Sequence, residues 1–435
     1  MSGQSITEKW EYDTKIITSY DGHEQRIKVR QYPRHFISYD YPAMNSYEAQ
    51  WLRGLGRIRQ SDTYYIPMWH SPVHLRESHI GGKALYIRSE DMMSLDNCEY
   101  VEIFVKDDAN RTGINMVMQV YEYLDGIIGL MRPISVPLNK LNTWIYPLKK
   151  CSVQPMNGLQ YIWSNGSNVT HNFEDLLLVP PKVHIPYKYL SDYEYYEGWN
   201  RWNFPEDDGT GKQILLFEPQ WVGDNSVSLS TEKNVNRLDN ETGVFNYDLK
   251  NTKSTDIHTW EISLMNRKAI NNMIRFFKRV EGKRRAFYAP TWANDLNIVQ
   301  DIKSFSNHVY TDWRLISDFY LKNSRDKKFV IFTKDWHWHV LDVWTYGEER
   351  IGEERFGKII LKNPAGFDLD VSNILMTSYL NLVRLDSDEL QLNYETDGIA
   401  NITLVMREVD EIEGVGKYDT EVKETGGEVS GEIGW

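Results

Sequence analysis

Residues 260–264 (WEISL) and 287–292 (FYAPTW) enclose a stretch whose apolar residues recur at helical spacing. A looser version of the series occurs near the start of the chain, where residues 36–39 (FISY) precede a helical pattern and residues 64–69 (YYIPMW) follow it. Both series predict a strand, an amphipathic helix and an aromatic pair that leads into proline and tryptophan two residues apart. This shared order is the basis of the predicted fold.

The two helical patterns carry start and stop signals. Asn45 and Ser46 can cap the first, and Glu48 lies three residues after Asn45 as in a capping box. Gly282 supplies a C-terminal stop for the second. The apolar positions expected on one face are Tyr47, Trp51, Leu52, Leu55 and Ile58 in the first helix, and Ile270, Met273, Ile274, Phe277 and Val280 in the second.

The resemblance between the two series continues into later strand-like segments. Segment 100–105 corresponds to 328–333, segment 116–121 to 338–343, and segment 173–179 to 400–406. The agreement in order and spacing predicts an internal duplication over roughly residues 10–180 and 215–408. The alternative is a chance similarity between two unrelated α+β domains.

Composition and the positions of proline, glycine and acidic residues divide the chain into four parts. We predict a first β-rich repeat over 1–180, an aromatic connection over 181–214, a second β-rich repeat over 215–408, and an acidic, glycine-rich flexible tail over 409–435. Aromatic residues make up 13% of the chain, and they favour pleated surfaces. The predicted fold class is mainly β (α+β), with two duplicated sandwich-like or barrel-like domains that each pack one amphipathic helix.

Charge and cysteine content exclude several classes of protein. A net charge of −13 argues against non-specific nucleic-acid binding, which needs a basic surface. Two cysteines cannot build a disulfide scaffold, and no apolar run approaches the ~18 residues of a membrane span. We therefore expect no membrane segment, no specific nucleic-acid partner and no cofactor.

Two groups of residues are candidate interfaces. The aromatic connection can serve as a protein interface, as a sugar-stacking platform, or as the packing contact that holds the two repeats together. The basic group can contact an acidic neighbour, such as the tail of an adjacent subunit, or can simply compensate a helix C-terminus. The candidates are Tyr193, Tyr195, Tyr196, Trp199 and Trp202 in the connection, and Lys283, Arg284 and Arg285 in the basic group.

No catalytic or metal site is predicted. His337 and His339 share a strand face, but a solvated or hydrogen-bonded pair is the favoured interpretation. His70 and His74 have metal-helix spacing, but Pro72 lies between them and opposes the helix. Accidental carboxylate pairs are guaranteed among 62 acidic residues, so no glycosidase pair can be assigned.

The second series, extended by Asp295 and Leu296, resembles tail proteins of tailed bacteriophages. In those proteins a strand and a helix lead into a glycine turn and the segment Phe-Tyr/Trp-x-Pro-Thr-Trp-x-x-Asp-Leu, which residues 287–296 follow. The similarity is greatest to distal-tail and tail-tip proteins, which form rings at the end of the tail tube. It covers about half the chain, and the first series matches more loosely, with Ser71 and Pro72 in place of the region around Asn294 and Asp295.

This resemblance implies a non-enzymatic structural subunit of a tail tip or baseplate, made in the host cytoplasm and incorporated in the tail of the virion. Its partners would be other tail proteins: the tail tube, hub, fibre or receptor-binding proteins. Two fused repeats can contribute twice to a ring, so a trimer could mimic a hexamer. The alternative function, suggested by the tryptophan and tyrosine content, is a carbohydrate-binding or carbohydrate-cleaving β-sandwich protein.

Overall fold

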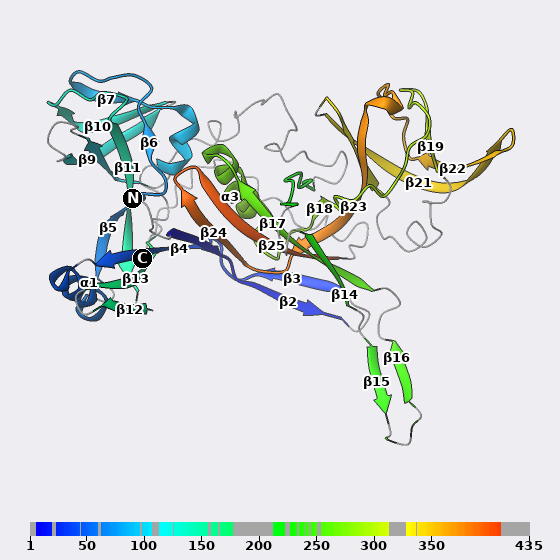
Figure 1. Ribbon diagram of the computed structural model, residues 1–435, viewed down its shortest axis with the longest axis horizontal. Helices are drawn as coiled ribbons and strands as arrows, with labels where there is room; N and C mark the ends of the chain where they lie inside the picture. The colour runs from blue at the N-terminus through cyan, green and yellow to red at the C-terminus, as the bar shows by residue number, and fades with distance from the viewer. Residues whose placement is uncertain are drawn as a thin grey trace, which may run out of the picture.

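A computed structural model shows an elongated molecule built mainly from antiparallel strands (Figure 1). The structure describes residues 6–19, 23–43, 45–59, 62–95, 98–106, 113–124, 126–154, 158–163, 166–176, 212–221, 227–232, 235–239, 241, 243, 245–249, 254–312, 328–335 and 337–409. The predicted mainly β fold class is confirmed, and the described residues include two α-helices.

The described residues of the first half of the chain form thirteen strands and one α-helix. They are β1 (Ile6–Glu11), β2 (Thr14–Thr18), β3 (Glu24–Lys28), β4 (Arg34–Ala43), α1 (Ser46–Ile58), β5 (Thr63–Pro67), β6 (Val73–His74), β7 (Gly82–Tyr86), the 3-10 helix η1 (Ser89–Leu95), β8 (Tyr100–Val105), β9 (Ile114–Leu124), β10 (Ile127–Ile134), β11 (Thr143–Val153), β12 (Gly158–Trp163) and β13 (Gly166–Asp175).

The second half repeats this series. Its elements are β14 (Val227–Glu232), β15 (Val235–Asp239), β16 (Phe245–Leu249), β17 (Thr255–Leu264), α3 (Arg267–Val280), β18 (Phe287–Pro290), β19 (His308–Asp312), β20 (Lys328–Thr333), β21 (Trp338–Ile351), β22 (Glu354–Leu361), the 3-10 helix η2 (Val371–Asn373), β23 (Ile374–Leu385), β24 (Glu389–Thr396) and β25 (Ile399–Glu408).

Strand pairing shows that the two halves are copies of one chain path. The pairs β4–β13, β5–β11, β8–β11, β8–β9, β9–β10, β7–β10, β11–β13 and β12–β13 recur as β17–β25, β18–β23, β20–β23, β20–β21, β21–β22, β19–β22, β23–β25 and β24–β25. Loop contacts recur as well, since His79 bridges Leu138 and Ile302 bridges Leu369. This recurrence of pairings agrees with the predicted duplication, which stays a prediction.

Each repeat contains a small barrel. In the first repeat the strands pair in the order β11, β8, β9, β10 and β7. A bridge between Leu75, just after β6, and Ile87, just after β7, brings these two strands together. Since β6 also pairs with β11, the barrel closes. Separate cores fill the two barrels, around Ile103 in the first and Phe329 in the second. The barrels lie at opposite ends of the molecule (Figure 1).

The two helices begin in the same way but differ in burial. Asn45 and Asn266 are the N-caps, and the Asn45 side chain accepts a hydrogen bond from the Glu48 backbone, as the capping box predicts. Most of α3 is buried, including the five apolar positions predicted to face the core. On α1 only Leu52 is fully buried among its five predicted positions, while Tyr47, Trp51 and Ile58 are exposed.

The N-terminal segment packs mainly with the second repeat, although the sequence analysis assigns it to the first. Trp10 and Tyr12 belong to the hydrophobic core that contains α3, β17 and β25. Residues 214–217 also enter this core, and Ile214 forms a parallel bridge to Tyr288, so the end of the predicted connection belongs with the second repeat. The described parts of the aromatic connection begin only at residue 212.

The end of α3 provides a test of the packing of the second repeat. Gly282 has φ +65°, and a Cβ atom there would lie 2.5 Å from Asp388 Oδ1. That oxygen cannot move away from the new methyl group without breaking the hydrogen bond that it accepts from the Lys283 backbone. We expect Gly282→Ala to lower the free energy of unfolding by about 2 kcal/mol or more, measured by chemical denaturation.

The matched control is Gly54→Ala in the middle of α1, where no atom lies within 4 Å of the new methyl group. We expect that substitution to raise the free energy of unfolding by up to about 1 kcal/mol, because alanine favours the helix. Equal effects of the two substitutions would show that the left-handed turn after α3 is unimportant.

Candidate functional site: the junction between the repeats

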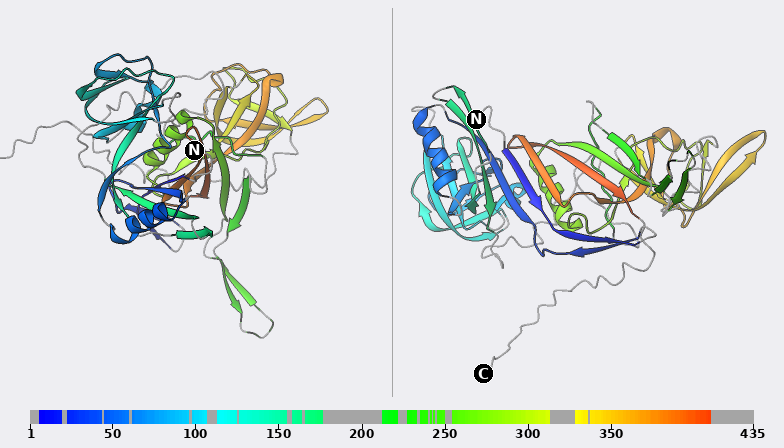
Figure 2. Two further views of the ribbon diagram at one scale, coloured as in Figure 1. Left: turned by 60° about the vertical axis from the view of Figure 1, so that its left-hand side comes forward. Right: turned by 90° about the horizontal axis from the view of Figure 1, so that it is seen from below.

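The two repeats are joined by the first strand of the chain. β1 pairs antiparallel with β4 of the first repeat on one edge and with β24 of the second repeat on the other, so that Ile6 lies between Tyr39 and Tyr394. Figure 2 shows the blue N-terminal strands beside the orange C-terminal strands. A strand hydrogen-bonded on both edges makes the sheets of the two repeats continuous. We call the contacts of β1 with β4 and β24 the junction.

A buried cluster of ionisable side chains lies on one face of the junction. Glu8 Oε1 lies 2.8 Å from His35 Nε2, and His35 Nδ1 lies 3.1 Å from Asp175 Oδ2. Tyr394 donates its hydroxyl to Glu8 Oε2 at 2.6 Å, and His70 Nε2 lies 3.5 Å from the same oxygen. The cluster therefore connects β1 with both repeats.

The pKa shifts of Glu8, His35 and Asp175 all run toward the charged form, against the effect of burial. Burial alone would raise the pKa of Glu8, but hydrogen bonds from His35 and His70 hold it well below its ordinary value. Burial alone would lower the pKa of His35, but Asp175 and Glu8 raise it. The pKa of Asp175 is lowered by His35 against its own burial, whereas burial lowers the pKa of His70.

Aromatic and cationic groups cover this cluster. The Trp10 ring stacks on His35 with centroids 3.9 Å apart, and Lys278 Nζ lies 4.0 Å from the centre of the Trp10 ring. Arg267, at the start of α3, donates to the backbone carbonyl of His70 in the first repeat. Packing of this kind excludes water from the ion pairs, which strengthens them.

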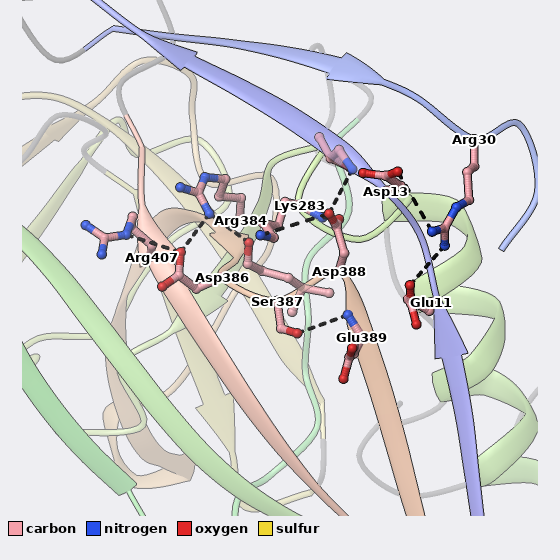
Figure 3. A network of polar contacts seen from close by, with 12 residues as sticks. Glu11, Asp13, Arg30, Lys283, Arg384, Asp386, Ser387, Asp388, Glu389 and Arg407 are labelled. Carbon is pink, nitrogen blue, oxygen red and sulfur yellow. Dashed lines mark hydrogen bonds and ion pairs between the residues drawn. The ribbon is translucent and has the colours of Figure 1, made fainter. Parts of the chain in front are cut away.

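A second polar network fixes the N-terminal segment to the turn between β23 and β24 (Figure 3). Asp388 accepts hydrogen bonds from the backbone N–H groups of Lys283 and Thr14, at 2.9 and 2.8 Å, and its carbonyl accepts from Tyr12. One side chain thus holds the turn after α3 and the start of β2. Asp386 accepts from Arg384 at 2.9 Å and from Arg407 at 3.3 Å.

The hairpin of β2 and β3 is bound to the second repeat by ion pairs. Arg384 binds both carboxylate oxygens of Glu24 at 2.8 Å, and its side chain is almost fully buried. Lys28 Nζ lies 2.6 Å from Glu281, the left-handed C-cap of α3. A bidentate, buried arginine contact is among the stronger polar interactions in proteins.

The predicted basic group lies beside this hairpin and is occupied by contacts within the chain. Lys283 is 4.0 Å from Asp388, Arg284 and Arg285 pair with Glu281, and the Arg284 carbonyl accepts from Arg26. These contacts agree with compensation at a helix C-terminus. Tyr193, Tyr195, Tyr196, Trp199, Trp202 and the acidic tail lie outside the described residues.

The two histidine pairs that the sequence offers as possible metal ligands do not form a common site. His74 pairs with Asp91 while His70 lies in the junction, and His339 stacks on Phe367 while His337 pairs with Asp335. Within the part of the chain that the structure describes, no group of three histidine, cysteine or acidic side chains could hold a metal ion. No described helix is long and apolar enough to cross a membrane.

The sequence analysis missed the buried cluster. Glu8, His35 and Asp175 stand far apart in the sequence, and each is an ordinary polar residue in a strand-like segment. The one available signal was Trp10, a large apolar residue in an otherwise polar N-terminal stretch. Its partners His35 and Lys278 lie far from it in the sequence, so no local pattern could identify them.

Comparison with known proteins assigns no family. No protein-family model matches the chain, and the search of curated proteins found no match.

Removing one member of the buried cluster should weaken the junction. We expect Glu8→Gln to lower the free energy of unfolding by about 3 kcal/mol, because His35 keeps its charge while losing a partner. Urea denaturation would measure the loss. Glu389→Gln is the control, since its ion pair with Lys9 is largely exposed and should change stability by no more than about 1 kcal/mol. Similar losses in both variants would contradict a special role for Glu8.

The cluster also predicts a pH dependence. Because the pKa of His35 is raised, its contribution to stability is complete below the unfolded-state pKa of about 6.5 and is lost as the pH rises through the folded-state value. Glu8 and Asp175 have lowered pKa values, so their contribution is lost as the pH falls through those values. We expect His35→Gln to reduce the free energy of unfolding more at pH 6 than at pH 9. A pH-independent difference would contradict the charged state.

Proposed function

We propose that this chain is a non-enzymatic structural subunit of a bacteriophage tail tip or baseplate, within a distal-tail-like ring between the tail tube and the host-recognition apparatus. The observation that carries the proposal is the junction: two copies of one fold are joined edge to edge through β1 into a continuous sheet. A subunit of this design carries equivalent strands in two places, which suits a contact repeated from subunit to subunit around a ring.

The segment that resembles phage tail proteins has a structural role, which supports the proposal. Pro290 pairs with Leu380 in the ladder between β18 and β23. Trp292 is buried and stacks on Phe332, with centroids 5.0 Å apart. Asp295 Oδ2 accepts hydrogen bonds from the Tyr379 backbone, at 2.8 Å, and from Thr291. The motif therefore forms a corner that the Asp295 side chain fixes to β23.

Localisation and activity provide the test. An antibody against the chain should label the tail tip of virions from cells that express the gene, and mass measurement of the assembled particle should give a ring stoichiometry, three or six copies. The purified chain should bind no sugar in a glycan array and release none in a reducing-sugar assay. Virions that lack the chain would contradict the proposal, and a measurable sugar affinity lost in Trp199→Ala or Trp202→Ala would favour the carbohydrate alternative.

A further inference from the structure

The elements of the junction have counterparts elsewhere in the chain. β1, the hairpin of β2 and β3, and β4 correspond to β14, the hairpin of β15 and β16, and β17, with the same strand lengths and the same spacing along the chain. The register agrees too, since Ile6 pairs with Tyr39 and Val227 pairs with Trp260. β14 is therefore the second copy of β1.

The strand that receives β1 also has a second copy. β24 receives β1 on one edge and pairs with β25 on the other, and β12 pairs with β13 in the same way. Both pairs carry the same irregularity, with a register shift after Tyr394 in β24 and after Tyr161 in β12. β12 is therefore the equivalent of β24, with Tyr161 in the position of Tyr394.

β1 and β24 differ from their equivalents β14 and β12 in the number of strands that pair with them. β1 and β24 have partners on both edges, whereas among the described residues β14 pairs with β17 alone and β12 with β13 alone. The side chains reflect this difference, because Glu8 of β1 is 5% exposed and its equivalent in β14, Leu229, is 59% exposed. An exposed strand edge of this kind is a template for pairing with another chain.

The helices show the same contrast. α3 is covered from the first half of the chain: Tyr12 packs on Phe277, and Met93 of η1 packs against the core that contains α3. The equivalent helix α1 leaves Tyr47, Trp51 and Ile58 exposed by 78, 60 and 81%. Large apolar groups gathered on one helix in this way are typical of an interaction surface.

We propose that the uncovered surface is the subunit interface, and that its occupant is a second copy of this chain. The outer edge of β14 in one copy pairs antiparallel with the outer edge of β12 in the next, so that Val227 faces Tyr161 and Ser228 faces Gln160. The hairpin of β15 and β16 then lies beside α1 of the next copy, as the hairpin of β2 and β3 lies beside the end of α3. The contact repeats the junction between molecules and is head to tail, so successive copies close a ring when the rotation permits.

The second hairpin has a role in the same contact. Figure 1 shows β15 and β16 projecting away from the body, whereas β2 and β3 lie along the second repeat. The ion pairs that bind the first hairpin, Glu24 with Arg384 and Lys28 with Glu281, show where such a hairpin lies relative to its acceptor. The equivalent acceptor is the first repeat of the next copy, near the α1 C-cap Arg59.

Cysteine pairs distinguish this contact from others. Antiparallel partners have Cα atoms about 4.5–5.5 Å apart, which suits a disulfide. We expect a mixture of the single variants Ser228→Cys and Gln160→Cys to form a covalent dimer on oxidation, and the double variant to form a ladder of multimers on a non-reducing gel. Thr7→Cys with Asn393→Cys is the matched positive control, since these residues pair within one chain. The native Cys98 and Cys151 are buried.

A surface substitution tests the helix contact. We expect Trp51→Asp to weaken self-association at least about ten-fold in light-scattering titrations, as loss of a buried interface aromatic does, while the unfolding midpoint stays unchanged. Ile80→Asp is the control, because Ile80 is 89% exposed and lies outside the proposed surface. Equal effects of the two substitutions would contradict the inference.

The inference deepens the proposed function by naming the surfaces with which the ring closes, and it rests on that proposal for the biological setting. The two fail separately. Rings in which the mixed cysteine variants do not cross-link, although the Thr7 and Asn393 pair does, would overturn the interface and leave the proposed function standing. Cross-linked rings that are absent from virions would overturn the proposed function alone.

Discussion

The structure depends on the hydrogen bonding of one six-residue strand. A β-strand presents N–H and C=O groups on two edges, and an edge left unpaired is a liability that proteins must cover or use. β1 satisfies the edge of β4 in the first repeat and that of β24 in the second. Without it, two barrel-bearing repeats would meet through few backbone contacts, and their relative orientation would depend on side chains alone.

Charge adds specificity to this backbone contact. A hydrophobic strand could pair with either edge in several registers, because backbone hydrogen bonds are nearly independent of sequence. Glu8 accepts from His35 on β4 and from Tyr394 on β24, and each of these contacts is lost if β1 slips by one residue. Buried ionic groups contribute little net stability, but a slipped register would leave charges without partners in the protein interior. In this chain the cluster selects one register from several.

The two repeats have the same topology but differ in what they bury. The second repeat has a large continuous core because Trp10, Tyr12 and α3 complete it. The equivalent region of the first repeat has a small core and a helix with exposed aromatic and aliphatic side chains. This asymmetry is what one internal junction in a two-repeat chain produces: the chain can cover only one of its two acceptor surfaces by itself.

The sequence by itself determined the mainly β fold class and many of the strands and helices that the two halves share. The helical spacing after Asn45 and Asn266 and the apolar strand-like runs at β8 and β20 are local patterns, visible in neighbouring residues. It also placed Gly282 at the end of α3, where the backbone has a positive φ that glycine adopts without strain. Only the tertiary structure decided that the N-terminal strand belongs to both repeats, that Glu8 meets His35 and Asp175, and that α3 is buried while α1 is not. Those facts arise from contacts between residues far apart in the chain, and no local pattern records which distant edge a strand will pair with.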